Sequence, residues 1–396
     1  MVGGAGIGGL TAALALARSG FRVVVLEQAE RLEETGAGIQ LSPNAARTLI
    51  GLGLEEQLRA QVVAPSALRV LDAQSGREIV RMPLGDAAAQ RYGAPYWVIH
   101  RGDLQAALAN AVAETPGLSL KLGTRMEAFA VQTNGVTVSA RCATGVLKET
   151  GTALIAADGL WSATRKRLGH DAAPRFVHRA AWRALIPAKD VAPEFKEPLV
   201  RLWLGADAHL VHYPVKGGSL VNIVLIMDDA WNAPGWSEPA SRADLLRRIS
   251  KSDWAPQALS LISTPESWLK WALYDLKPLQ RWSQGPVALL GDAAHPMLPY
   301  LAQGAAMAIE DAAVVAQCLA QTPDDPTAAL RTYWAARNAR AHKVQRLAAR
   351  NGARYHLSGV RAMVRNLAMH ALGGARLLHH YDWLYDWRPP AAASVT

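Results

Sequence analysis

The stretch at the start of the chain limits most strongly what this sequence can fold into. It carries G-x-G-x-x-G at Gly4, Gly6 and Gly9, and residues 11–19 then show a helical pattern that closes at Gly20. The glycines allow a tight turn and let the backbone approach a bound pyrophosphate closely. Free N–H groups at the start of the following helix favour an anion. This order of elements predicts a dinucleotide-binding turn.

A buried strand completes this motif. Residues 21–26 are almost all apolar and lead to Glu27, an acidic residue at the distance from the glycines that suits contact with ribose hydroxyls. Glycines followed by helix, strand and acid are far more specific than the glycine pattern alone. Met1–Gly3 are the only residues ahead of the motif, whereas a strand usually runs about five residues. We expect either a very short first strand or a natural start upstream of Met1.

A second strand-to-helix junction lies late in the chain. The apolar run 287–290 ends at Gly291 and Asp292, and an alanine-rich helix starts near Gln303 and Gly304. A carboxylate at the end of a buried strand is costly unless a polar group, such as a sugar-like hydroxyl, meets it. The helix N-terminus suits a developing negative charge. The segment therefore predicts a hydrogen-bond acceptor for a polyol beside a binding site for an anion.

Shorter patterns fill the part between these junctions. Residues 35–44 are expected to form a glycine-bearing loop that leads into a helix, and residues 68–82 a hairpin. Arg101 stands ahead of another helix. Residues 118–157 have the pattern of a strand meander, which ends at Asp158-Gly159.

The pattern changes to long alternating strands from residue 176 to 227, as in an antiparallel sheet. Helices are expected over 240–275 and 327–356. We therefore predict an α/β fold, with a Rossmann-like nucleotide-binding domain, an inserted antiparallel-sheet domain and C-terminal helices. The expected boundaries are 1–73, 98–172 and 281–350 for the first domain, 74–97 and 173–280 for the inserted domain, and 351–396 for the C-terminal helical segment.

Composition narrows the class of protein. Of 396 residues, 50% are hydrophobic and 19% are charged, as in ordinary globular proteins. We expect no membrane span, because polar residues and prolines interrupt the apolar runs, and no signal peptide, because a basic start is missing. Cys142 and Cys318 have no metal-ligand spacing, so we expect no metal site and a reducing, cytoplasmic location.

The net charge of +9 comes largely from late arginines. We interpret these as the solvated faces of long helices, since neither a basic patch interleaved with aromatic residues nor a nucleic-acid-reading module is present. Nucleic acid is therefore not an expected partner. A positive charge would still attract a small anionic substrate.

Taken in order, these motifs resemble those of the single-component (class A) FAD-dependent aromatic hydroxylases, which share the para-hydroxybenzoate hydroxylase-like fold. Salicylate hydroxylase, 3-hydroxybenzoate 6-hydroxylase and 6-hydroxynicotinate 3-monooxygenase are the most similar. The resemblance implies non-covalent FAD, with NADH or NADPH as co-substrate. A second G-x-G-x-x-G, which a separate nicotinamide-nucleotide domain would need, is missing from the sequence. The implied cofactor-binding residues are Gly4, Gly6, Ile7, Gly9, Glu27, Gln40, Arg101, Asp158, Gly159, Asp292, Gln303, Gly304 and Ala305.

The resemblance also implies roles for some of these residues. Glu27 and the glycines would hold the ADP half of FAD, Arg101 would reach the pyrophosphate and Asp292 the ribitol. Asp158-Gly159 would serve both FAD and the nicotinamide nucleotide. The helix that opens at Gln303 would face the pyrimidine edge of the flavin.

The same family suggests the reaction: dioxygen adds to reduced flavin, and the resulting hydroperoxide transfers oxygen to an electron-rich ring. The protein would exclude water and help to ionise the ring hydroxyl. His209 and Tyr213 match the substrate strand of the family, and strand alternation puts both on one face. The alternative for His209 is an ordinary sheet histidine. Pro299 and Tyr300 are expected in the loop over the flavin.

Three further side chains are weaker candidates for the site. His212 points to the other face of its strand, and we expect it to be structural. His295 is expected to order its loop rather than act as a base. Arg183 could meet a substrate carboxylate, but no motif supports that role.

We therefore expect an FAD-dependent monooxygenase that hydroxylates a small phenolic or hydroxypyridine ring, carboxylated, and acts as a monomer or homodimer. Two alternatives stay open. One is the same chemistry on a larger acceptor, such as a polyketide, a quinone precursor or a urate-like ring, which would need a larger pocket. The other is a flavin-binding protein that has lost hydroxylation and serves as a redox-responsive module. The sequence leaves open the exact substrate, the position hydroxylated, any coupled decarboxylation, and NADH versus NADPH.

Overall fold

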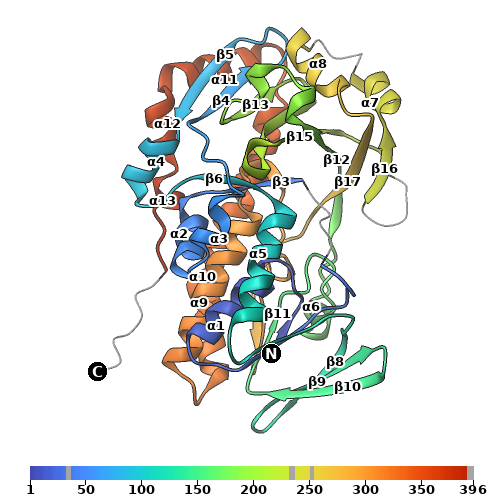
Figure 1. Cartoon of the computed structure of the whole chain (residues 1–396), viewed down its shortest axis with the longest axis vertical. Helices are drawn as coiled ribbons and strands as arrows, with labels where there is room; N and C mark the ends of the chain where they lie inside the picture. The colour runs from blue at the N-terminus through green and yellow to red at the C-terminus, as the bar shows by residue number, and fades with distance from the viewer. Residues whose placement is uncertain (33–36, 232–236, 250–253, 390–396) are drawn as a thin grey trace.

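Strands from three distant parts of the chain build the sheet that underlies the N-terminal motif. The structure, a computed structural model, describes residues 1–32, 37–231, 237–249 and 254–389 (Figure 1). The order of this six-stranded sheet is β18-β19-β11-β1-β2-β7, and all neighbours are parallel except β18 and β19. The strands are β1 (Val2–Gly3), β2 (Val23–Leu26), β7 (Leu118–Lys121), β11 (Leu154–Ala156), β18 (Ser283–Gln284) and β19 (Val287–Leu289).

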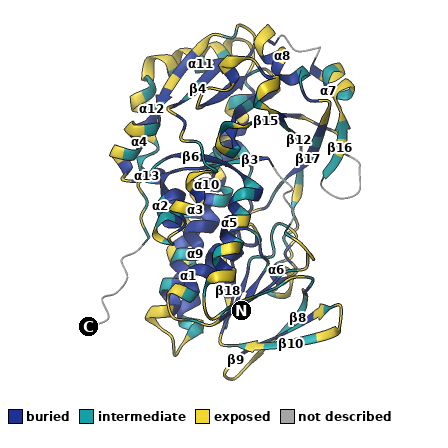
Figure 2. Cartoon of the chain, in the orientation of Figure 1, coloured by how far each residue is buried: buried dark blue, intermediate teal, exposed yellow. Residues whose placement is uncertain are grey.

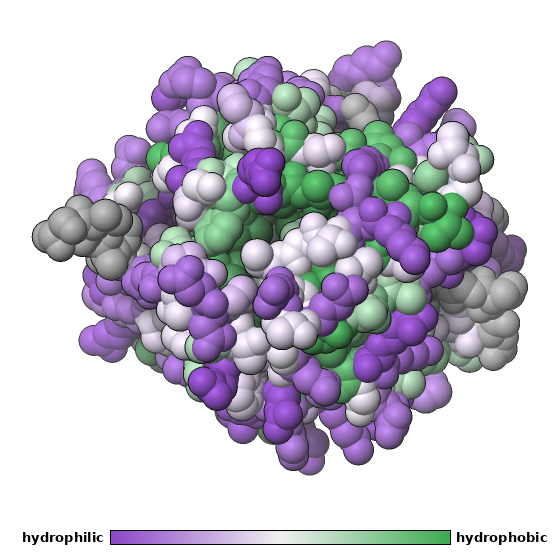
Figure 3. All heavy atoms as spheres, turned by 90° about the horizontal axis from the view of Figure 1, so that it is seen from below, coloured by the Kyte–Doolittle hydropathy of each residue, from purple (hydrophilic) through white to green (hydrophobic). Residues whose placement is uncertain are grey.

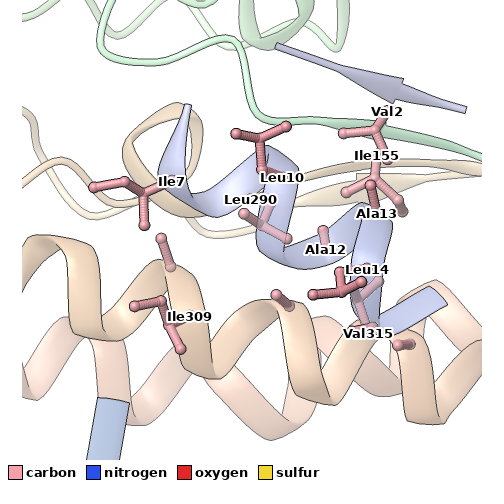
Figure 4. Close-up of a cluster of buried hydrophobic side chains, with 14 of the residues drawn as sticks. Val2, Ile7, Leu10, Ala12, Ala13, Leu14, Ile155, Leu290, Ile309 and Val315 are labelled. Carbon is pink, nitrogen blue, oxygen red and sulfur yellow. The ribbon is translucent and has the colours of Figure 1, made fainter. Parts of the chain in front are cut away.

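Two helices, α1 (Ile7–Arg18) and α9 (Gly304–Gln321), pack closely beside this sheet. Both are largely buried, as the dark blue ribbons of Figure 2 show. Leu10 and Leu14 of α1 lie in the core with Ile309 of α9 (Figure 4). Gly8 makes the close packing possible, because a Cβ there would lie 3.0 Å from Cβ of Ala308. Burial of this apolar face, at roughly 25 cal/mol per Å², holds the motif helix in place.

A second, eight-stranded sheet lies beyond the first domain, at the top of Figure 1. Its order is β16-β17-β12-β15-β14-β13-β4-β5, and all neighbours are antiparallel except β13 and β4. The strands are β4 (Ala67–Asp72), β5 (Glu78–Pro83), β12 (Arg175–Pro187), β13 (Leu199–Leu204), β14 (Ala208–Val215), β15 (Leu220–Asp228), β16 (Ser237–Ser241) and β17 (Ser267–Asp275).

This sheet confirms the inserted antiparallel sheet and the hairpin expected over 68–82. Both strands of the hairpin, β4 and β5, belong to the eight-stranded sheet. The expected domain boundary at residue 73 therefore falls inside one hairpin.

Two local predictions need correction. Residues 240–275 are not helical throughout, because 267–275 form β17, which lies between the edge strand β16 and β12. Trp268 and Leu273 of this strand pack in two different apolar clusters. A short apolar run of this kind cannot be told from a helix by pattern alone. In the expected loop 35–44, residues 38–41 form β3, which pairs with β6 (Trp97–His100). Thr35 and Gly36 lie outside the described residues.

The remaining elements surround the two sheets. A three-stranded antiparallel sheet of β8 (Arg125–Gln132), β9 (Gly135–Cys142) and β10 (Gly145–Gly151) confirms the middle of the meander expected over 118–157. The ends of that range are a correction, because β7 and β11 pair in parallel within the six-stranded sheet. The 30-residue helix α10 (Pro326–Tyr355) packs against α9. The other helices are α2 (Pro43–Gly51), α3 (Glu55–Arg59), α4 (Gly85–Tyr92), α5 (Arg101–Glu114), α6 (Ala163–Arg167), α7 (Arg242–Ile249), α8 (Pro256–Ser263), α11 (Gly359–Leu372), α12 (Gly374–His380) and α13 (Asp382–Tyr385). Within the described ranges, no helix is both long and apolar enough to cross a membrane.

Candidate active site

A cavity of about 990 Å³ opens at the carboxyl ends of β1, β2 and β11. This is the edge of a parallel sheet at which ligands of such folds bind. The lower face of the molecule, seen in Figure 3, is hollowed, with apolar atoms inside a hydrophilic surround. The predicted cofactor residues that line the cavity are Gly4, Gly6, Glu27, Arg101, Asp158, Gly159 and Asp292. We name it the cofactor cavity.

Steric contacts explain why the motif needs glycine at Gly4 and Gly9. Gly4 has a φ of +103°, and a Cβ there would lie 2.4 Å from the Ala157 carbonyl oxygen. A Cβ on Gly9 would lie 1.9 Å from the carbonyl oxygen of Gly4. Larger residues would push the turn apart and fill the space that a pyrophosphate needs.

Glu27 follows β2 and points across the turn. Its carboxylate accepts hydrogen bonds from the Ala5 N–H, at 2.7 Å, and from the Ala29 N–H, at 2.9 Å. These bonds fix the side chain at the rim of the cofactor cavity. The cradle of glycines with a fixed acidic residue fits the adenosine half of FAD.

Two aspartates face the other half of the cavity. Asp158 accepts a hydrogen bond from the Thr164 N–H, at 3.1 Å, while its Oδ1 is buried with no partner in the part of the chain that the structure describes. The guanidinium of Arg165 donates to the carbonyls of Ala293 and Leu160, at 3.0 and 2.5 Å, and so ties the two aspartate loops together. An unpartnered carboxylate oxygen is a suitable acceptor for a cofactor hydroxyl or amide.

Asp292 lines the cofactor cavity, and its side chain is exposed there although many protein atoms surround it. Its desolvated position raises the pKa of the carboxyl, against the opposing charges of His295, Arg101 and Arg165. A polyol that donates hydrogen bonds to this carboxylate would relieve part of the cost. The residue is therefore suited to hold the ribitol of FAD.

We predict that Asp292→Ala loses FAD more readily than the wild type. Loss of one charge-assisted hydrogen bond, worth about 1.5–3 kcal/mol, corresponds to roughly 10- to 100-fold weaker binding. Titration of the apoprotein with FAD, followed by flavin fluorescence, measures the effect. Asp324→Ala, at an exposed aspartate, is the control. Equal affinity of both variants would show that the Asp292 carboxylate makes no useful contact.

Six predicted cofactor residues do not line this cavity: Ile7, Gly9, Gln40, Gln303, Gly304 and Ala305. Ile7 packs in the core near Ile309 (Figure 4). The Gln303 side chain is buried in a polar network: its amide donates to the Ser42 hydroxyl at 2.9 Å and accepts from Asn44 at 3.3 Å. Gln303, Gly304 and Ala305 can therefore reach a cofactor only through the backbone at the start of α9.

A second cavity, of about 570 Å³, lies between the eight-stranded sheet and the C-terminal helices. His209, Pro299 and Tyr300 line it, as do Gln40 of β3 and many apolar side chains of β4, β13, α11 and α12. Pro299 also lines the cofactor cavity, so the two cavities meet at the turn Pro299–Leu301. We name this second space the substrate cavity.

The faces of β14 are as alternation predicts. His209 and Val211 line the substrate cavity, and Tyr213 packs with Val211 in the same apolar cluster. His212 is on the other face, in ring contact with Phe195 and Trp203. His212 thus has the structural setting that we expected.

Tyr213 is buried like His209, but it does not line the substrate cavity. It packs on Gly38, where a Cβ would lie 2.6 Å from its ring. Burial raises the pKa of its hydroxyl, while the nearby Arg183 and a hydrogen bond with Gln40 lower it. Tyr213 therefore lies beside Gln40 of the substrate cavity and Arg183 of the cofactor cavity, but it lines neither cavity.

His209 has an unusual environment. Its ring contacts those of Tyr300, Tyr355 and His356, at centroid distances of 5.4, 5.3 and 5.0 Å. Burial lowers the pKa of His209 well below the usual value, and the charges of His356 and Arg179 act in the same direction. The imidazole is therefore neutral at physiological pH, as a proton acceptor must be.

Tyr300 closes the inner end of the substrate cavity. Gly352 of α10 makes room for it, because a Cβ there would lie 2.6 Å from the Tyr300 ring. Arg179 donates to its hydroxyl at 3.4 Å. Burial raises the pKa of Tyr300, and Arg179 opposes that shift.

Three residues of the site were weakly indicated by the sequence or not indicated at all. Arg183 lines the cofactor cavity, and its guanidinium lies 5.6 Å from the centre of the Trp271 ring. No sequence motif had pointed to it. Tyr355 and His356 end α10 and reach β14 from a position 147 residues away in the chain. Aromatic residues at a helix end, ahead of Ser358-Gly359, were the only available hint.

Known proteins have sequences and structures related to this chain. A family model described as an FAD binding domain matches residues 1–348. 3-Hydroxybenzoate 6-hydroxylase 1 of Aquipseudomonas alcaligenes is 37% identical over 389 residues, which cover 97% of this chain and 96% of that protein. 6-Hydroxynicotinate 3-monooxygenase of Bordetella bronchiseptica is 36% identical over 347 residues, 87% of this chain and 88% of that protein.

Among solved structures, a salicylate hydroxylase substrate complex is similar. It has a TM-score of 0.81 and 27% identity, and the match covers 99% of this chain and 98% of that one. The similarity therefore extends over both sheets and the C-terminal helices, well beyond the glycine motif.

Proposed function

Because the chain belongs to the FAD-binding family of aromatic hydroxylases, we propose that it hydroxylates a small phenolic or hydroxypyridine ring that carries a carboxylate, with dioxygen as the oxygen source. The observation that carries this proposal is the meeting of the two cavities at Pro299, with His209 within the substrate cavity. A ring held there would have a neutral imidazole on one side and the cofactor on the other. The names of the relatives, which refer to hydroxybenzoate and hydroxynicotinate, support the substrate class.

FAD, when bound, takes a hydride from NADH or NADPH and delivers one oxygen atom of dioxygen to the ring. The chain itself would supply three things. Its glycine turn, Glu27 and Asp292 hold the cofactor; the apolar walls of the substrate cavity exclude water; and His209 accepts the proton of the ring hydroxyl. An ionised hydroxyl makes the ring a better nucleophile.

Arg183 is the residue that we propose for the substrate carboxylate. It is enclosed beside the cofactor cavity, and burial lowers the pKa of its guanidinium, with Tyr213 acting in the opposite direction. A carboxylate would compensate such a desolvated cation. A reducing, cytoplasmic location is also part of the proposal, because Cys142 and Cys318 are both free thiols.

A larger acceptor is the second candidate, and the size of the substrate cavity favours it. At about 570 Å³, the cavity is in the range of sites for drug-sized ligands, roughly 300–1,000 Å³. Its outer walls are apolar, with Val364, Met369 and Leu377 among the lining residues. A ring with an apolar substituent would use this outer part.

The test is a screen of hydroxybenzoates, hydroxynicotinates and alkyl-substituted phenols for stimulated NADH and NADPH oxidation, with oxygenated products identified by mass spectrometry. Hydroxylated product from a small carboxylated ring supports the first candidate. Product from alkyl-substituted rings alone supports the second. Nicotinamide oxidation that yields hydrogen peroxide and no product with any ring would leave a flavin-binding redox module and contradict both.

A further inference from the structure

A second imidazole stands directly behind His209. His356, at the C-cap of α10, places its Nε2 2.7 Å from Nδ1 of His209. Both side chains are buried, with 2% and 8% of their surface exposed. The bond joins the substrate strand to the helix that packs on the cofactor domain, and no motif in the sequence predicted it.

The bond restricts the tautomers of the pair. Two neutral imidazoles that share one hydrogen bond need one donor and one acceptor. If Nδ1 of His209 donates, its Nε2 keeps a lone pair and can accept a proton. If His356 donates, Nε2 of His209 carries a hydrogen and cannot act as a base. The partner behind His209 therefore decides what His209 can do.

We propose that His356 is a positioning residue for His209: its Nε2 accepts the hydrogen bond from Nδ1 of His209, so that Nε2 of His209 presents a lone pair to the hydroxyl of the aromatic substrate. The inference rests on the proposed function of His209. As the O–H bond of the ring hydroxyl breaks, its electron pair stays on oxygen and a new N–H bond forms at His209 Nε2. The proton on Nδ1 then passes to Nε2 of His356, and the positive charge is spread over two rings.

The surroundings disfavour a protonated histidine pair. Arg179 of β12 faces both histidines and lowers the pKa of each, and burial acts in the same direction. Asp228 of β15, which pairs with Arg179 at 3.0 Å, raises the pKa of His356, whereas Arg365 of α11 lowers it. The uncharged neighbours are the rings of Tyr300 and Tyr355. Of the two histidines, His356 is the one whose pKa the Asp228 carboxylate raises.

The test compares His356→Gln, which keeps an acceptor, with His356→Leu, which removes it. His212→Leu is the matched control, because it replaces a buried histidine on the opposite face of the same strand. Each FAD-loaded protein is given a ring that the wild type hydroxylates, and product per NADH or NADPH oxidised is measured between pH 6 and 9. We expect His356→Leu to lose on the order of 10- to 100-fold in hydroxylation, with flavin reduction unchanged.

The pH profile separates this role from a structural one. Without His356, the ring hydroxyl must ionise largely unaided, so the pH for half-maximal coupling should rise by about one unit. His356→Gln should restore most of the coupling and the original profile. Wild-type coupling and profile in His356→Leu would overturn the inference. So would a Gln variant as impaired as the Leu variant.

A second measurement needs no substrate and none of the His356 variants. Imidazole ¹⁵N NMR of the wild-type holoenzyme reports the tautomer of each histidine, and His209→Gln assigns the signal of His209. A hydrogen on Nδ1 of His209 is the expected result, and a hydrogen on Nε2 would overturn the inference. If the wild type hydroxylates no ring, the proposed function fails, and the tautomer still decides the positioning role.

Discussion

His209→Ala and Tyr213→Phe are expected to uncouple nicotinamide oxidation from hydroxylation. His209 lines the substrate cavity and Tyr213 packs with Val211 of its wall, whereas the glycine turn, Glu27 and Asp292 are untouched. Both variants should therefore retain FAD and still oxidise NADH or NADPH. General acid–base assistance contributes on the order of 10²–10⁴ to a step of this kind, so the hydroxylation rate should fall by that range for His209→Ala.

The effect of Tyr213→Phe should be smaller. Tyr213 is not in the cavity wall, and it acts beside Gln40 and Arg183, with a hydroxyl that burial keeps protonated by raising its pKa. Loss of a neutral hydrogen bond is worth about 0.5–1.5 kcal/mol, or roughly 3- to 10-fold.

The measurement is product formed per nicotinamide oxidised, with hydrogen peroxide counted separately. His212→Leu is again the control, since it alters the other face of β14. Coupling at the wild-type level in His209→Ala would reduce His209 to an ordinary sheet histidine. The proton acceptor would then have to be sought at Tyr300.

Local patterns sufficed to predict much of the fold. The Gly4–Gly9 turn, the helix after it and Glu27 depend on contacts within about 25 residues, such as the Ala5 N–H to Glu27 bond. Strand alternation likewise predicted the two faces of β14, because the side-chain period is a property of the strand itself. Hairpin and meander also followed from turns and alternation.

What the sequence could not predict depends on contacts between distant segments. Gln303 was expected at the cofactor, but its side chain bonds to Ser42, 261 residues away. His356 meets His209 only because α10 ends beside β14. β17 has an apolar pattern that suits either a helix or a strand, and its pairing with β12 and β16 decides between them. Sequence patterns predict strand faces and turns, but they do not predict which distant elements come into contact.

The buried charge cluster behind the cofactor site leads to the second large effect. Arg337 of α10 forms ion pairs with Glu310, at 2.6 Å, and with Asp311, at 2.7 Å, and all three are at most 1% exposed. His295 also bonds to Asp311, at 2.5 Å, which explains its role in ordering the loop after Asp292. The cluster thus fixes α9, whose N-terminus begins the predicted flavin seat.

We expect Arg337→Leu to lower the stability of the protein by about 3–5 kcal/mol, because it removes a buried counter-charge that Glu310 and Asp311 share. Glu310 would then rely on Arg340, and Asp311 on His295. A loss of that size corresponds to roughly 5–10 °C in Tm. Arg331→Leu, at an exposed arginine of the same helix, is the control. Thermal unfolding of the holoenzymes measures the difference.

The pKa of Asp311 determines how the stability difference between Arg337→Leu and wild type should change with pH. Burial alone would raise the pKa of Asp311, but His295 and Arg337 outweigh it and lower the pKa to about 2. A carboxyl with a folded pKa below its unfolded value of 3.8 adds stability above pH 3.8, and this contribution is lost as pH falls toward 2. The Tm difference between Arg337→Leu and wild type should therefore be large at pH 7 and shrink between pH 4 and pH 2. If Arg337→Leu had the same Tm as the Arg331→Leu control at pH 7, a structural role for the cluster would be contradicted. If the Tm difference between Arg337→Leu and wild type grew on acidification, the role of the Asp311 charge would be contradicted.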